Sequence, residues 1–293
     1  MEKIPVLLDT DIGSDIDDAM ALAYLLKQPK CDLLGITTVT GDVQQRAALA
    51  EVVCRSVGRS HIPIHCGRRD VLVHGVGQPR VPQYEAIEHV PHHLNRPENS
   101  AVEFLRHTIR SRPGEITLLS IGPYSNVALL FAMDPEIPFL LRSLVSMAGI
   151  FYGGDRREWN ALVDPTATSI VYGAKRKDHL SVGLDVTEKC RLGAEEVRRR
   201  FVGEPLHTVR TLAETWFKQV KEATFHDPLA AALIFRPEIC TYESGQVVTE
   251  ITADLNQCGH TKLVPGSGPD RVAKTVNVDM FFKEYFEVTT GAK

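Results

Sequence analysis

The sequence predicts an α/β fold, in which a mainly parallel open sheet is flanked by helices within a single domain over residues 1–293. Three observations predict it. Short apolar segments recur along the chain, helical patterns separate them, and no linker-like boundary or internal repeat interrupts the series. In such sheets ligands bind outside the carboxyl ends of the strands. The fold class therefore indicates where a functional site should lie.

The expected elements follow in chain order. Strands are expected at 4–8, 32–39, 62–66, 115–121, 144–149 and 180–185. Helices are expected between them, where apolar residues recur every three or four positions, at 17–28, 44–57, 99–111, 125–133 and 165–174. Helices resume after 195, and the strongest patterns are at 206–222 and 227–235. A β-like segment at 246–253 and a strand–helix unit from 271 to 288 end the series.

Residues 67–98 break this rhythm. The segment is rich in His, Pro, Gly and Arg and shows no clear periodicity. Long loops inside compact domains are usually functional or mobile. We therefore expect 67–98 to be a flap over the active site.

Composition excludes several kinds of partner. The chain is 43% hydrophobic and 24% charged, with a formal net charge of −4, so no basic excess points to nucleic acid. No apolar stretch approaches the ~20 residues that span a bilayer, and the run 4–8 is too short for a signal-peptide core. The six cysteines are scattered without a Cys-x-x-Cys pair, which is typical of reduced, mostly buried thiols. We expect a cytoplasmic protein that binds neither membranes nor nucleic acid.

The most informative feature is an acidic turn near the amino terminus. Five aspartates fall within ten residues, between a buried apolar strand and a helix that begins near Asp17: Asp9, Asp11, Asp15, Asp17 and Asp18. Helix capping accounts for one or two of them. So many carboxylates at one strand end repel each other unless a cation neutralises them, and the usual candidate is a hard divalent ion, Ca²⁺ or Mg²⁺.

Four further motifs carry polar groups at expected turns. His226-Asp227-Pro228 opens an apolar helix, although Asp227 could simply be its N-cap with His226 incidental. Gly122-Pro123-Tyr124-Ser125-Asn126 joins a strand to a helix, where main-chain groups are open to a ligand. In Glu158-Trp159-Asn160 the alternation points two polar side chains the same way, which suits a polyhydroxylated ligand, unless this is a surface loop. His74, in the long loop, could equally be a solvated histidine.

Taken together and in this order, the motifs resemble the inosine–uridine-preferring nucleoside hydrolase family over nearly the whole chain. The opening Asp9-x-Asp11-x-Gly13, followed by Asp17-Asp18-Ala19, is similar to that family's signature. The resemblance implies a Rossmann-like core and hydrolysis of the N-glycosidic bond of ribonucleosides to free base and ribose. It also implies a small-molecule nucleoside partner, and we expect a homodimer or homotetramer.

The resemblance also implies roles for individual residues. The cofactor would be Ca²⁺, bound by Asp11, Asp18, Asp227 and the main-chain carbonyl of Ser125. The catalytic residues would be Asp11, as general base on the Ca²⁺-bound water, and His226, as a proton donor to the leaving base. The substrate-binding residues would be Asp17, Asp42, His74, Glu158 and Asn160. Asp9, Asp15 and Asn126 would support the site from behind these residues.

The sequence departs from the family pattern at three places. Ser14-Asp15-Ile16 lengthen the signature, so Asp15 has no assigned ligand role. Asp42 stands where many members carry Asn and could still accept a hydrogen bond from a sugar hydroxyl or a metal-bound water. The family's other sugar-binding Asn has no clear match in 150–155. A catalytically altered member that binds or cleaves another ribosyl ligand therefore stays open, as does the preferred base.

Two unrelated classes also place aspartates in this pattern. A Mg²⁺-dependent phosphohydrolase of the haloacid-dehalogenase type has Asp-x-Asp after a strand, but it requires Thr or Val where Gly13 stands and a later Asp-Asp pair. An EF-hand loop starting at Asp9 would need Gly and Glu at the positions of Ser14 and Met20. Both fit the residues less well than the nucleoside hydrolase pattern.

Overall fold

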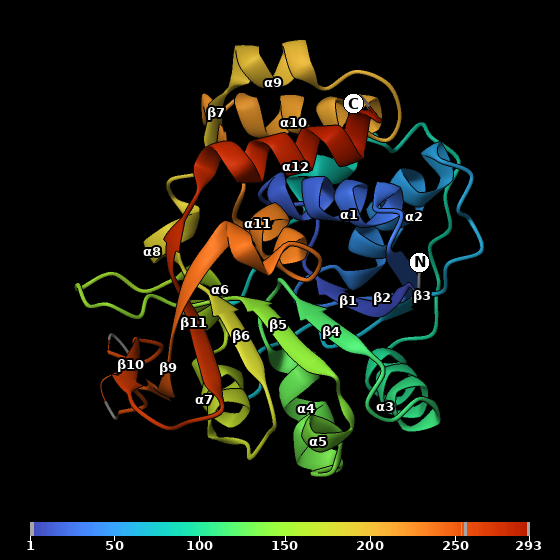
Figure 1. Cartoon of the computed structure of the whole chain (residues 1–293). Coiled ribbons are helices and arrows are strands. Elements are labelled where there is room, and N and C mark those ends of the chain that lie inside the picture. The colour runs from blue at the N-terminus through green and yellow to red at the C-terminus, as the bar shows by residue number, and fades with distance from the viewer. Residues whose placement is uncertain (1–2, 253, 255–256, 292–293) are drawn as a thin grey trace.

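The computed structural model describes residues 3–252, 254 and 257–291, and within them nine strands form one sheet (Figure 1). The spatial order is β10-β9-β11-β6-β5-β4-β1-β2-β3. The strands are β1 (Ile4–Thr10), β2 (Cys31–Thr38), β3 (Ile64–Cys66), β4 (Thr117–Ser120), β5 (Ser143–Met147), β6 (His179–Val182), β9 (Cys240–Thr249), β10 (Thr261–Pro265) and β11 (Asp270–Val276). The predicted α/β class is confirmed.

The strand order places the acidic turn near the middle of the sheet. From β3 to β11 all neighbouring strands run parallel, whereas β9 pairs antiparallel with β11 and with the edge strand β10. Asp9 in β1 lies level with Thr37 of β2 and Ser120 of β4. The turns that follow β1, β4 and β5 therefore open side by side at one edge of the sheet.

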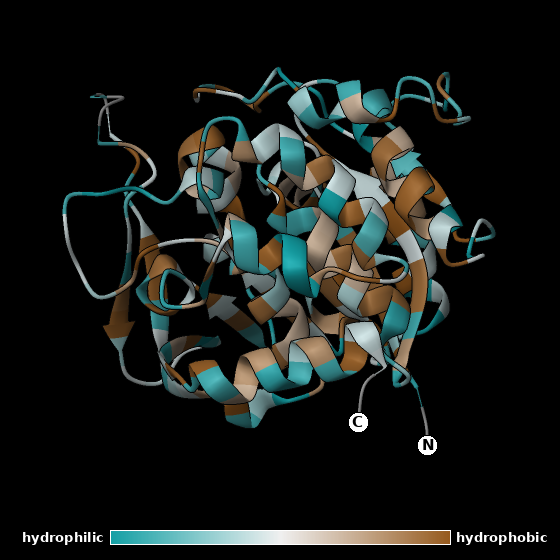
Figure 2. Ribbon diagram, turned by 90° about the horizontal axis from the view of Figure 1, so that it is seen from above, coloured by the Kyte–Doolittle hydropathy of each residue, from teal (hydrophilic) through white to brown (hydrophobic). Residues whose placement is uncertain are grey.

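Helices cover both faces of the sheet (Figure 1). One face carries α1 (Asp17–Lys27), α2 (Val43–Ser56), α10 (Leu206–Phe217), α11 (His226–Leu233) and α12 (Val278–Thr290). The other carries α3 (Ala101–Ser111), α4 (Ser125–Met133), α5 (Ile137–Leu140) and α7 (Pro165–Gly173). Two large apolar clusters, one on each side of the sheet, form the core. Figure 2 shows helix ribbons that alternate between hydrophobic and hydrophilic residues, as expected when one face packs on a sheet.

Shorter elements complete the fold. They are the helices α6 (Trp159–Val163), α8 (Leu184–Thr187) and α9 (Ala194–Arg200), the 3₁₀ turns η1 (Pro82–Ala86) and η2 (Pro237–Ile239), and the small antiparallel pair of β7 (Arg191–Gly193) and β8 (Glu222–Thr224). Among the described residues no helix combines the length and apolarity of a membrane span. All six cysteines are unpaired and buried, as predicted.

The carboxyl-terminal third differs most from the sequence prediction. The helix expected at 206–222 ends at Phe217, because the chain turns there into β8. The β-like segment expected at 246–253 belongs to a strand that begins at Cys240 and ends at Thr249, and residue 253 lies outside the described residues. β10 was not predicted. β10 is the edge strand and β9 pairs with it. Exposed positions of the two strands hold polar residues but also Val248 and Val264, so their apolar alternation is weak.

Candidate functional site

The acidic turn runs from the end of β1 at Thr10 to the start of α1 at Asp17, beneath the loop 67–98. Gly13 has a φ of +119°, and a Cβ atom there would lie 2.4 Å from the side chain of Val81. A larger residue would therefore be strained and would push the loop away. The loop is held down by hydrogen bonds from Gln83 to the main chain of this turn, at 3.1 Å to Gly13 and 2.8 Å to Asp15.

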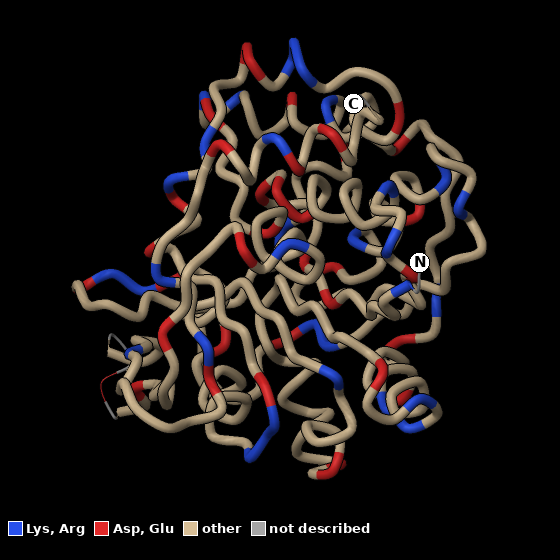
Figure 3. The backbone as a smooth tube through the Cα atoms, in the orientation of Figure 1, with Lys and Arg blue, Asp and Glu red and all other residues tan. Residues whose placement is uncertain are grey.

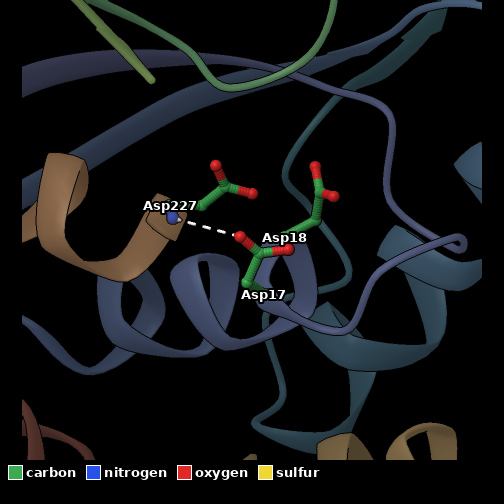
Figure 4. A group of neighbouring side chains, drawn as sticks. All are labelled: Asp17, Asp18 and Asp227. Atoms are coloured by element: carbon green, nitrogen blue, oxygen red, sulfur yellow. Dashed lines mark hydrogen bonds between the residues drawn. The ribbon is translucent and has the colours of Figure 1, made fainter. Parts of the chain in front are cut away.

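Three carboxylates converge where α1 and α11 begin. Asp17, Asp18 and Asp227 are buried, and each offers an oxygen within 4.8 Å of the others (Figure 4). The amide of Asp227 donates to Oδ2 of Asp17 at 3.3 Å, and the hydroxyl of Thr10 donates to Asp18. Figure 3 shows acidic residues gathered in the interior beside the start of α1, whereas most other charges lie around the periphery.

The electrostatics of this cluster favour a bound cation. Burial raises the pKa values of Asp17, Asp18 and Asp227 well above the usual range of aspartate. Repulsion by the neighbouring carboxylates raises these pKa values further. A divalent ion would remove that repulsion, and an all-oxygen donor set fits a hard cation. The side chains present therefore fit a divalent metal.

Asp11 lies in the same cavity but contacts different groups. Its Oδ2 accepts a hydrogen bond of 3.0 Å from the amide of Gln78, and a Cβ atom at Gly122 would lie 2.9 Å from its Oδ1. Burial raises the pKa of Asp11, whereas the nearby Arg46 guanidinium lowers it. The structure thus groups Asp17 with Asp18 and Asp227, and places Asp11 beside them against the loop.

Of the residues expected behind the ligands, Asp9 and Asn126 are hydrogen-bonded to each other, whereas Asp15 lies in the cavity wall. Asp9 is fully buried, and its Oδ1 accepts hydrogen bonds from Asn126 at 2.8 Å and Thr37 at 2.5 Å. Ser125, the first residue of α4, donates its hydroxyl to Asp164 at 2.7 Å. Asp15 is half-buried and lines the cavity. Burial raises its pKa to about 7, although a hydrogen bond from the amide of Ile16 lowers it.

Glu158 and Asn160 face the same cavity, but through a helix start rather than an extended strand. Glu158 caps α6 by accepting from the amides of Asn160 and Ala161, at 2.7 and 3.0 Å. Asn160 donates its amide to the carbonyls of Ile121 and Met147, at 2.9 and 3.0 Å. Glu158 also accepts from the amide of Gly149, just after β5, at 3.0 Å, so the polar pair is fixed at the carboxyl edge of the sheet.

His226 also lines the cavity. Its Nδ1 lies 2.7 Å from the hydroxyl of Thr187, so Nε2 is the ring nitrogen left for a ligand. Burial lowers the pKa of His226 to about 4, whereas the carboxylate of Glu188 raises it. Trp216, in the last turn of α10, and Gln219, just after this helix, also line the cavity and were not predicted.

Two predicted substrate contacts lie elsewhere in this structure. Asp42 caps α2, where its Oδ1 accepts from the amides of Gln44 and Gln45 at 3.1 and 3.0 Å. His74 is half-buried in the loop 67–98 and does not line the cavity. Their contacts with substrate stay predictions.

Two further residues, one in the cavity and one beneath it, were missed by the sequence analysis. Gln78 lines the cavity from a loop that has no periodicity, so no pattern indicated which of its side chains would turn inward. Arg46 is fully buried beneath the acidic turn. A signal for Arg46 was present, because the residue falls on the apolar face of α2 together with Val43, Ala47 and Ala50.

The acidic cluster, the polar pair and His226 line one cavity of about 680 Å³. This arrangement defines an α/β enzyme whose acidic site at the carboxyl edge of a parallel sheet suits metal-assisted hydrolysis of a small polar molecule.

Comparison with known proteins assigns the family. The profile of the inosine-uridine preferring nucleoside hydrolases matches residues 6–283. A pyrimidine-specific ribonucleoside hydrolase of Escherichia coli, RihA, is 31% identical over 262 residues, covering 81% of each chain. Uridine nucleosidase 1 of Arabidopsis thaliana is 27% identical over 89% of this chain and 82% of its own. The solved structure of a purine-preferring ribonucleoside hydrolase from Gardnerella vaginalis superimposes with a TM-score of 0.83 at 22% identity and covers 98% of both chains.

The chain belongs to the inosine-uridine preferring nucleoside hydrolase family. It is a hydrolase that acts on N-glycosyl bonds. The resemblance predicted from the sequence motifs is confirmed.

Proposed function

We propose that the protein hydrolyses ribonucleosides to free base and ribose in one direct displacement by water, with Ca²⁺ as its cofactor. One observation carries the proposal: the carboxylate cluster shares a single cavity with Glu158, Asn160 and His226. Cleavage of an N-glycosidic bond passes through an oxocarbenium-like transition state. It needs an activated water on one face of the sugar and help for the departing base.

The residues divide this work between them. Asp11 accepts the proton of the attacking water, and Asp17, Glu158 and Asn160 bind the sugar hydroxyls. His226 contacts the departing base through Nε2. General acid–base help is worth ~10²–10⁴-fold, so sugar positioning and electrostatic stabilisation supply most of the rate enhancement.

Asp11, Asp18, Asp227 and the carbonyl of Ser125 are the proposed Ca²⁺ ligands, and Asp17 lies close enough to contribute. When bound, a divalent cation orients the attacking water and lowers its pKa. Carboxylate and carbonyl oxygens, completed by waters and substrate hydroxyls, match the 6–8 ligands at ~2.3–2.6 Å that Ca²⁺ prefers. Elemental analysis of purified protein should show Ca²⁺ in stoichiometric amounts, and stoichiometric Zn²⁺ would contradict the assignment.

The decisive experiment incubates the purified protein with inosine, uridine, adenosine and cytidine. Reducing sugar should be released without added phosphate, and the panel also ranks purine against pyrimidine bases. The similar proteins have names that point both ways, since one is pyrimidine-specific and another purine-preferring. Absence of hydrolysis with all four nucleosides, or a strict requirement for phosphate, would overturn the proposal.

A further inference from the structure

The proposed reaction leaves one buried cation unexplained. Arg46 on α2 is 0% exposed, and burying a guanidinium is costly unless all its donors are paired. Among the described residues it forms no ion pair with a carboxylate. Its nitrogens donate instead to main-chain carbonyls and one hydroxyl: Thr40 at 2.7 Å, Ile12 at 3.1 Å, Gln78 at 3.2 Å, the hydroxyl of Ser14 at 3.2 Å, and Asp11.

These acceptors belong to two segments that are far apart in the sequence. Nη1 of Arg46 donates to the carbonyls of Asp11 and Ile12 in the acidic turn, and Nη2 donates to the carbonyl of Gln78 in the loop 67–98. The side chains of Gln78 and Asp11 also contact each other, since the side-chain amide of Gln78 donates to Oδ2 of Asp11 at 3.0 Å. The side-chain carbonyl of Gln78 accepts a hydrogen bond from the indole N–H of Trp159 at the cavity rim. Arg46 thus fixes the main chain on both sides of the contact between Gln78 and Asp11.

The backbone at Gly41 gives the loop room to make this contact. Gly41 has a φ of +64°, and a Cβ atom there would lie 2.2 Å from the carbonyl oxygen of Gln78. The amides of Thr40 and Gly41 bind the carbonyls of Arg68 and Arg69, at 2.7 and 2.8 Å, so the start of the loop is fixed on the same turn. The same carbonyl of Gln78 is thus bound by Arg46 and needs the space left by Gly41.

We propose that Arg46 is a positioning residue that holds Gln78 against the carboxylate of Asp11 and so fixes the oxygen that Asp11 presents to the attacking water. Its effect on turnover rests on the proposed role of Asp11. The seating of the loop on the acidic turn does not depend on that role. Arg46→Lys keeps the charge, but its single nitrogen cannot occupy the positions of both Nη1, which binds the acidic turn, and Nη2, which binds Gln78.

The test compares Arg46→Lys, Gln78→Leu, the double variant and Gly41→Ala. Arg176→Lys is the control, because Arg176 is also buried and donates to the main-chain carbonyls of Val171, Tyr172 and Ala174. Unlike Arg46 it also forms an ion pair, with Asp270, and it lies outside the cavity. Three quantities are measured: Ca²⁺ affinity by calorimetry with the metal alone, amide hydrogen exchange of residues 76–84, and kcat and KM for the best nucleoside.

We expect Arg46→Lys to accelerate exchange in 76–84 and to lower Ca²⁺ affinity or kcat by ~10–100-fold, the usual loss when a group behind a metal ligand is removed. KM should change little, Gly41→Ala should behave in the same way, and the double variant should lose no more than the worse single variant. Arg176→Lys should lose stability only. Wild-type exchange and turnover in Arg46→Lys, or losses matched by Arg176→Lys, would refute the inference. Failure of the wild-type protein to hydrolyse any nucleoside would refute the proposed function and not this inference. The exchange measurement does not depend on turnover and would still show whether Arg46 holds the loop.

Discussion

The side-chain amide of Asn126 donates a hydrogen bond of 2.8 Å to Oδ1 of Asp9, which joins the start of α4 to the end of β1. The same amide nitrogen reaches the carbonyl of Thr38 at 3.1 Å, and the Asn126 oxygen accepts from the amide of Arg68 at 2.8 Å. One side chain therefore connects two strand ends, a helix and the beginning of the loop 67–98. These hydrogen bonds hold together the segments on which the acidic turn is built.

Asn126→Ala should destabilise the protein by about 1–3 kcal/mol, because the buried carboxylate of Asp9 and the amide of Arg68 each lose a partner. Urea unfolding followed by circular dichroism measures the change. Asn277→Ala is the control: Asn277 caps α12 through the amide of Met280 at 3.0 Å, away from the cavity. Both variants should lose stability, but only Asn126→Ala should also lose activity. Equal activity in the two would show that Asn126 does not support the site.

The sequence allowed most of the parallel core to be predicted, because buried strands and amphipathic helices carry strong periodic signals. The acidic turn was also predictable, since the mutual repulsion of five neighbouring aspartates follows from the sequence alone. The contacts of the loop 67–98 were not, because an irregular segment has no period that sets which side chains point inward. Gln78 turns into the cavity because contacts with Gln83, Arg46 and Gly41 fix the path of the loop, and these contacts are not apparent in the sequence.

Asp11→Asn should lower kcat by at least ~10²-fold, because the amide keeps the shape of the side chain but cannot take a proton from water. Steady-state kinetics at saturating Ca²⁺ separates this effect from weaker metal binding. Asp32→Asn, at a half-exposed carboxylate on β2, is the control and should leave kcat unchanged. A near-wild-type kcat for Asp11→Asn would remove the general-base assignment.

Glu51 on α2 should make the attachment of the loop 67–98 sensitive to acid. Partial burial raises its pKa, but hydrogen bonds from His93, Arg96 and Arg55 outweigh that effect and lower the pKa from 4.5 to about 2. Because the folded-state pKa is depressed, the stabilisation is present in full above pH 4.5 and is lost as the pH falls towards 2. Glu51→Gln should therefore cost on the order of 1–3 kcal/mol at pH 7.

The difference in unfolding free energy between the wild-type protein and Glu51→Gln should shrink as the pH is lowered through that interval. Urea unfolding at several pH values between 7 and the lowest at which both proteins fold measures it. Amide exchange of residues 91–96 should report the same loss locally. A difference that stays constant with pH would mean that the carboxylate charge of Glu51 does not hold the loop.

The final prediction concerns the leaving base. His226 lies beside Asp227 and is oriented by the hydroxyl of Thr187, so its Nε2 is the atom placed to contact the base. If His226 donates the proton, His226→Ala should severely slow the hydrolysis of natural nucleosides. It should spare p-nitrophenyl riboside, whose leaving group needs no proton. Thr187→Val should show a weaker form of the same selectivity, because it removes the orienting hydroxyl and keeps the imidazole. His74→Ala provides the comparison from the loop 67–98: selective loss there would transfer the acid role to His74. Equal losses on both substrates for His226→Ala would leave His226 with binding of the base alone.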